Sequence, residues 1–165
     1  MKTISIKNSY PLLIILFLYT LSNFFMFFNN GWFWDDWCSS TSEGIKEINE
    51  GVGTTFLIPI HTYLMNLTSY PALLYHILTG IFEIFGIWIF YKSLLLLGVS
   101  RSNTFLLSLI FALLPYNQAK ITMSCFMYSI GFLFFLLAIL FFIKFSHKNN
   151  IFIRLISLIF FFCSY

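Results

Sequence analysis

Five long apolar runs, separated by short polar stretches, constrain this chain more than any other feature. They cover residues 11–28, 71–97, 100–118, 121–145 and 151–165. A helix needs about 20 apolar residues to cross a bilayer, and in lipid its backbone groups must hydrogen-bond within the segment. Only 9% of the residues are charged, whereas a soluble domain carries about a quarter. The sequence therefore predicts an all-α, polytopic transmembrane helix bundle.

The last apolar run, 151–165, is shorter than the roughly 20 residues of a full span. We therefore expect about four full spans and a truncated fifth. All of them belong to a single membrane domain covering 1–165, which we interpret as the N-terminal part of a longer protein. A remnant without function, produced by an interrupted reading frame, is the alternative.

The distribution of Lys and Arg predicts the orientation of the bundle. With the N-terminus cytoplasmic, one side of the membrane carries seven of these residues and the other side carries two. This asymmetry follows the positive-inside rule, and it places the long loop 29–70 outside. The seven inner residues are Lys2, Lys7, Lys92, Arg101, Lys144, Lys148 and Arg154, and the two outer ones are Lys46 and Lys120.

The outer loop is expected to contain short interfacial helices. In 42–50, Ile45 and Ile48 are three residues apart, which is typical of one apolar helix face. Ser42 is the expected cap at the start of this helix, and glycines at 51 and 53 would end it. The half-apolar stretch 55–67 is short for a span, so it is interpreted as interfacial or re-entrant.

Two adjacent carboxylates, Asp35 and Asp36, follow the first apolar run closely and lie among Trp32, Trp34 and Trp37. Tryptophan favours the headgroup level of a membrane, so the pair is expected at the outer boundary. A carboxylate there can accept a proton from a hydroxyl nucleophile. The alternative is a solvated acidic turn that caps the first span.

The segment Phe33-Trp34-Asp35-Asp36-Trp37, directly after a first span, resembles the outer-loop acidic motif of GT-C membrane glycosyltransferases. Leu113-Leu114-Pro115-Tyr116-Asn117-Gln118 is similar to a segment of bacterial members. The resemblance implies transfer of a sugar from a polyprenyl-phosphate carrier to an acceptor hydroxyl on the outer face of the bacterial inner (plasma) membrane. It also implies catalytic roles for the pair, with Asp35 as general base and Asp36 as its partner or a divalent-metal contact, in an order that stays open. No cofactor is otherwise predicted.

Five further residues are candidates for substrate binding. Lys120 would neutralise the donor phosphate, unless it only reaches the lipid headgroups as a flanking lysine. His61 is either a binding residue or a packing residue with an interfacial hydrogen bond. Glu83 shares a helix stripe with His76 and Thr79 and should face the bundle or be protonated. The other two candidates are the ring residues Trp34 and Trp37.

The sequence also argues against several other classes of protein. No Lys/Arg-rich tract predicts nucleic-acid binding, and three cysteines without metal-type spacing predict neither a disulfide framework nor a zinc site. The expected partners are membrane lipid and the lipid-linked sugar donor, with the oligomeric state open. A fragment of a transporter or lipid-linked-sugar flippase, working through His76 and Glu83, is the second functional hypothesis.

Overall fold

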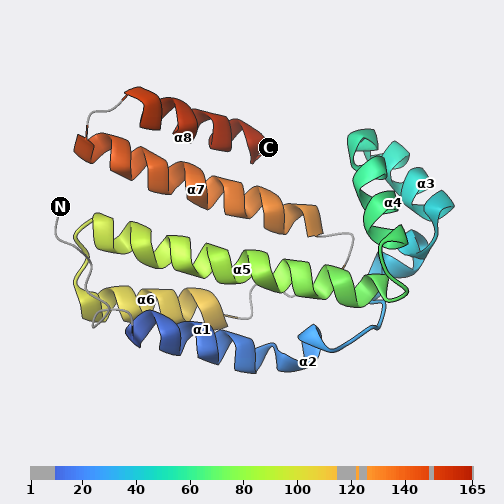
Figure 1. Cartoon of the computed structure of the whole chain (residues 1–165), viewed down its shortest axis with the longest axis horizontal. Coiled ribbons are helices and arrows are strands. Elements are labelled where there is room, and N and C mark those ends of the chain that lie inside the picture. Colours follow the sequence, from blue (N-terminus) through green and yellow to red (C-terminus); the bar gives the residue numbers. More distant parts are fainter. Residues whose placement is uncertain (1–9, 115–121, 123–125, 149–150, 165) are drawn as a thin grey trace. The chain divides into compact units, whose positions relative to one another are not determined.

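A computed structural model of the chain describes residues 10–114, 122, 126–148 and 151–164, apart from the side chains at 34, 35, 147 and 148. Every regular element in these ranges is a helix (Figure 1). In chain order the elements are α1 (Tyr10–Ser22), α2 (Phe24–Phe27), the 3-10 helix η2 (Trp34–Ser40), α3 (Ser42–Val52), the 3-10 helix η3 (Thr55–Leu57), α4 (Ile58–Asn66), α5 (Pro71–Leu96), α6 (Arg101–Leu113), α7 (Phe126–Lys148) and α8 (Ile151–Cys163).

Two of the described helices are long and apolar enough to cross a membrane. One is α5, with 26 residues, and the other is the 21-residue segment Phe126–Ser146 of α7. The remaining apolar helices α1, α6 and α8 have 13 residues each. The all-helical prediction is confirmed for the described residues. About four full spans were expected, and two of the described helices have spanning length.

The first predicted run, 11–28, is interrupted at Asn23. The hydroxyl of Ser22 and the side-chain amide of Asn23 both donate to the carbonyl of Tyr19, at 2.9 Å each. Side-chain bonds of this kind compete with the hydrogen-bond ladder of a helix. Hydrophobicity alone did not predict this break.

The third predicted run, 100–118, gives the shorter helix α6 for a similar local reason. Ser100 caps its start, because its hydroxyl accepts a hydrogen bond from the N–H of Asn103 at 3.4 Å. At its end, Leu114 is extended with ψ 123°. A residue before proline is pushed out of the helical region, and Pro115 follows.

The chain divides into two compact units, which are described separately. The membrane-helix unit consists of the described parts of 1–24, 82–116 and 130–165. The loop unit consists of the described parts of 25–81 and 117–129. The first unit holds α1, α6 and α8, and the second holds η2, η3, α3 and α4.

Stacked rings join three helices of the membrane-helix unit. Phe90 of α5 stacks on Phe111 of α6 with 4.4 Å between ring centroids, and Phe111 stacks on Phe132 of α7 at 5.9 Å. Each such pair adds about 0.5–1.5 kcal/mol beyond the burial of its area. The buried residues at the centre of this packing are Ile89, Leu136 and Leu140.

Small side chains let α1 pack closely against α6. Thr104, Ser108 and Ala112 repeat every four residues on α6 and are all buried. This spacing puts them on one helix face, and small residues at such a face allow close approach of a neighbouring helix. The α1 residues that are buried in return are Leu12, Ile15 and Tyr19.

The helices α7 and α8 run side by side in the membrane-helix unit (Figure 1). The rings of Phe141 and Phe160 stack at 5.5 Å with planes 5° apart, and the Ser157 hydroxyl donates to the carbonyl of Ala138 at 2.9 Å. The short α8 is therefore attached to a helix of spanning length.

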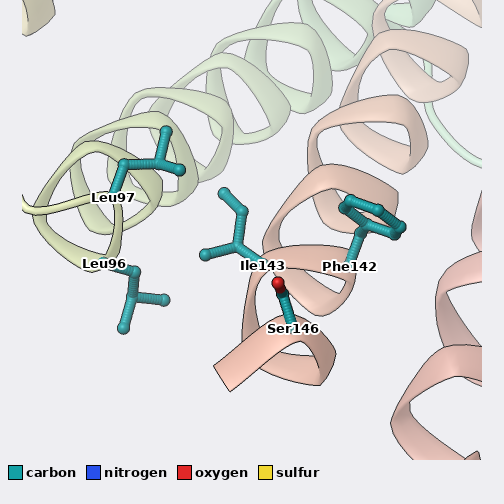
Figure 2. A pocket seen from close by; sticks show the side chains of 5 residues that line it. All are labelled: Leu96, Leu97, Phe142, Ile143 and Ser146. Atoms are coloured by element: carbon teal, nitrogen blue, oxygen red, sulfur yellow. The ribbon is translucent and has the colours of Figure 1, made fainter. Parts of the chain in front are cut away.

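A shallow apolar groove of about 280 Å³ lies near the C-terminal ends of α5 and α7 (Figure 2). Among the side chains that the structure describes around this groove, the hydroxyl of Ser146 is the polar group. Its other lining residues are Leu96, Leu97, Phe142 and Ile143.

Candidate functional site

The segment before the acid pair is tied to the first turns of α5. The side-chain oxygen of Asn30 accepts a hydrogen bond from the N–H of Leu73 at 3.3 Å, close to the start of α5 at Pro71. Nδ1 of His76 lies 2.8 Å from the carbonyl oxygen of Asn29. Because a carbonyl oxygen only accepts, His76 must carry a proton on Nδ1. These two contacts attach the segment that leads into η2 to the start of α5.

Asp36 stabilises the first turn of η2 from inside. Its carboxylate accepts a hydrogen bond from the N–H of Phe33 at 3.3 Å, and its own N–H donates to the Phe33 carbonyl at 3.0 Å. Asp36 is 1% exposed, so this acid is not a solvated surface group. The ring of Phe33 lies 5.8 Å from that of His76, which brings the same turn against α5.

The helix α3 packs against η2 and holds it from a second direction. Thr41, rather than the expected Ser42, caps α3, because its hydroxyl oxygen accepts the N–H of Gly44 at 3.1 Å. Gly44 lies against the carbonyl oxygen of Cys38 in η2, where a Cβ atom would overlap that oxygen. At the other end, Gly53 ends α3 as its C-cap with φ 78°, as the glycine pattern predicted.

A buried histidine–tyrosine pair links α4 to α5. Nδ1 of His61 lies 2.8 Å from the Tyr75 hydroxyl, and the two rings stack with centroids 5.7 Å apart. Phe126 of α7 covers Tyr75 edge-on at 5.1 Å. Burial lowers the pKa of His61 from its usual 6.5, because removal from water disfavours the charged imidazolium. His61 is therefore neutral at pH 7.

The charge of the Asp36 carboxylate also acts electrostatically on the Tyr75 hydroxyl. We call Asp36, Tyr75 and His61 the Asp36 cluster. All three side chains are at most 5% exposed. A buried hydrogen bond between two side chains fixes one arrangement of the elements that carry them. The bond between His61 and Tyr75 therefore ties α4 to the start of α5.

The structure brings some of the predicted site residues together and leaves others unassigned. His61 is bonded to Tyr75, and the charge of Asp36 acts on the same hydroxyl. Trp37 is 67% exposed on η2. The backbone of Trp34 and Asp35 lies in η2, but their side chains are outside the described residues, as is Lys120.

Glu83 lies on the part of α5 that belongs to the membrane-helix unit. It is half-buried and acts electrostatically on the buried Tyr19 of α1. His76 and Thr79, which precede it on the predicted stripe, are 2% and 1% exposed. The predicted substrate contact of Glu83 stays a prediction, and the contact with Asn29 gives His76 an anchoring role.

Sequence reasoning missed Tyr75 and the two asparagines. Tyr75 precedes His76 and lies one helical turn before Thr79. Its place next to a polar stripe at the start of a span was the sequence signal that could have identified it as a site residue. Asn29 and Asn30 gave no comparable signal, because their partners lie more than 40 residues later, with separations of 47 and 43.

Among the described residues, no three His, Cys, Asp or Glu side chains gather where they could hold a metal ion. Comparison with known proteins found no matching family model, no matching curated protein and no matching solved structure.

Proposed function

We propose that this chain is part of a GT-C-like membrane glycosyltransferase, which moves a sugar from a lipid-phosphate carrier to an acceptor hydroxyl on the outer face of the membrane. The observation that carries the proposal is the buried Asp36 in a short helix that is anchored to the start of the long apolar helix α5. A surface turn would leave this acid in water. Here the acid organises the backbone on which Asp35 also stands.

The two acids take different roles in this proposal. Asp36 is a positioning residue, because its carboxylate is buried and engaged with the Phe33 N–H. Asp35 is the general base, and it accepts the proton of the acceptor hydroxyl. As the acceptor oxygen bonds to the anomeric carbon, the bond from that carbon to the carrier phosphate breaks, and the phosphate leaves with the electron pair.

The remaining candidates bind the donor in this scheme. Lys120 neutralises the departing phosphate. Trp34 and Trp37 contact the carrier at headgroup level, where tryptophan rings are favoured. His61 acts through the Asp36 cluster, since its Nδ1 is bonded to Tyr75 and it lies at 5% exposure. Glu83 contributes a polar group within the membrane.

The proposal includes a topology. The chain is multi-pass, with the N-terminus in the cytoplasm of a bacterial cell, about four full spans and the loop 29–70 outside. Cys38 is exposed and tests this directly. With Cys125 and Cys163 replaced by Ser, a membrane-impermeant maleimide should label Cys38 in intact cells. Labelling only after permeabilisation would refute both the topology and the catalytic scheme.

The catalytic scheme is tested by single and double substitution of the acids in cells that carry the whole protein. Asp35→Asn should lower sugar transfer to the cell envelope by about 10²–10⁴-fold, the usual contribution of a general base. Asp36→Asn should lower transfer less and should also lower stability. Membrane insertion should be normal in both. Unchanged transfer in the double variant would end the proposal.

The transporter or flippase hypothesis draws support from one observation, the half-buried Glu83 in the membrane-helix unit, whose charge acts on the buried Tyr19. Acidic groups at membrane depth commonly mark substrate or ion paths. Glu83→Gln distinguishes the two functions. Loss of sugar uptake with normal behaviour of Asp35→Asn would favour transport, and the reverse pattern would favour glycosyl transfer.

A further inference from the structure

Four large apolar side chains form a stripe on one face of the segment that runs from η3 through α4 to Leu67. They are spaced four, three and four residues apart, which is the repeat of a single helix face. They are 43–70% exposed. The members of this α4 stripe are Phe56, Ile60, Tyr63 and Leu67.

The orientation of the stripe is fixed by the opposite side of the same segment. Leu57 and His61 are 8% and 5% exposed, and His61 is bonded to Tyr75. Rotating α4 to bury the stripe would break this hydrogen bond and expose the imidazole. The stripe therefore faces outward as a consequence of the bond between His61 and Tyr75.

The surface of α4 differs in its charged residues from that of α3, which packs beside it (Figure 1). No Asp, Glu, Lys or Arg occurs in residues 51–82. The outward face of α3 instead carries an exposed ion pair, with Nζ of Lys46 3.8 Å from Glu50. The other exposed acids of α3 are Glu43 and Glu47. The outer surface of α3 suits water, and that of α4 does not.

The chain itself keeps the α4 stripe close to a membrane. Leu67 precedes Pro71, the first residue of the spanning-length α5, by four positions. Four residues reach at most about 14 Å. The headgroup region on each side of a bilayer is roughly 5–8 Å thick. Tyr70, 59% exposed, lies in this connection and adds an aromatic ring of the kind found at membrane boundaries.

From these observations we infer that the α4 stripe is a lipid-contact surface, with α4 lying in the plane of the interface and its stripe inserted at the boundary of headgroups and acyl chains. On the first part of α5, Ile77 and Ile81 are exposed as well. This inference requires only that α5 spans the membrane, and it stands or falls independently of glycosyl transfer. It puts His61 on the face of α4 turned away from lipid.

Depth-dependent quenching of a fluorescent label tests the surface. In a background with all three cysteines replaced by Ser, a bimane label is placed at Tyr63→Cys or Ile60→Cys, and for the control at Glu47→Cys on α3. The chain is reconstituted into dilute phosphatidylcholine–phosphatidylglycerol vesicles with lipid nitroxides near the headgroups. Quenching by these lipids should be about threefold or more stronger at 60 and 63 than at 47, and quenching by aqueous iodide should show the reverse order.

Three results would overturn the inference. Position 63 could be quenched by iodide as strongly as position 47, which would place it in water. It could be shielded from both quenchers, which would indicate cover by a second copy. The third result is quenching by lipid nitroxides at one of positions 60 and 63 and by iodide at the other, which would place one label in lipid and the other in water. Circular dichroism and gel filtration of each labelled chain establish that the variants compared are folded.

Discussion

Nδ1 of His61 lies 2.8 Å from the hydroxyl oxygen of Tyr75, and both side chains are buried. The two residues come from different helices, α4 and α5, and they are 14 positions apart in the chain. Their bond fixes the rotation of α4 about its own axis, and the charge of Asp36 acts on the same Tyr75 hydroxyl. The properties of the loop unit depend on this bond.

Tyr75→Phe should lower the free energy of unfolding by about 1–3 kcal/mol, because it leaves a buried imidazole nitrogen without its partner. Denaturant titration in detergent micelles measures the loss. Tyr63→Phe is the matched control, since that tyrosine is 66% exposed and the same hydroxyl is removed there. Equal stability of the two variants would contradict an energetic role for the pair.

The stability of the protein should fall with acidification through the window below pH 6.5. Burial lowers the pKa of His61 in the folded state below its usual 6.5, so the unfolded chain binds the proton more tightly. The contribution of the neutral imidazole is complete above the unfolded pKa and is lost as the pH falls beneath it. The free energy of unfolding should be lower at about pH 5 than at about pH 7.5, and the difference between the two values should be smaller in His61→Gln. An unchanged pH dependence in that variant would exclude His61 as the titrating group.

Gly44→Ala should displace η2, because the added Cβ would overlap the backbone carbonyl oxygen of Cys38. We expect a loss of about 1–3 kcal/mol in unfolding free energy, as for overpacking elsewhere. Gly51→Ala in the same helix is the control. A Cβ there meets nothing within 4 Å, so that variant should gain about 0.5–1 kcal/mol. A tolerated Gly44→Ala would show that α3 and η2 are not in close contact.

Ser108 offers a test of the packing between α1 and α6. It is fully buried, and its hydroxyl has no hydrogen-bond partner among the described residues. Ser108→Ala should therefore be neutral or stabilising by about 1 kcal/mol, whereas Ser108→Leu should cost about 1–3 kcal/mol by separating the helices. Thermal unfolding in micelles compares both variants with Leu107→Ala at the exposed neighbouring position. A tolerated leucine at 108 would mean that this face of α6 is not packed.

Local sequence patterns predicted where helices form better than they predicted how long those helices are. The apolar runs predicted α5 and α7 well, because nothing inside them competes with the helical ladder. The runs 11–28 and 100–118 gave shorter helices, since Asn23 and Pro115 act on the backbone directly. The amphipathic pattern of 42–50 predicted α3, and its cap differs from the expected one by one residue.

The sequence by itself determined the all-helical class, the low charge that suits lipid and the position of an acid pair beside an apolar run, because each of these depends on neighbouring residues. It did not determine which buried partners that pair meets. Tertiary structure decided that Asp36 turns inward, that His61 bonds to Tyr75 and that the α4 stripe faces outward. The reason is physical: a buried polar group takes the partner that folding brings within about 3 Å, and that partner is set by the packing of whole helices.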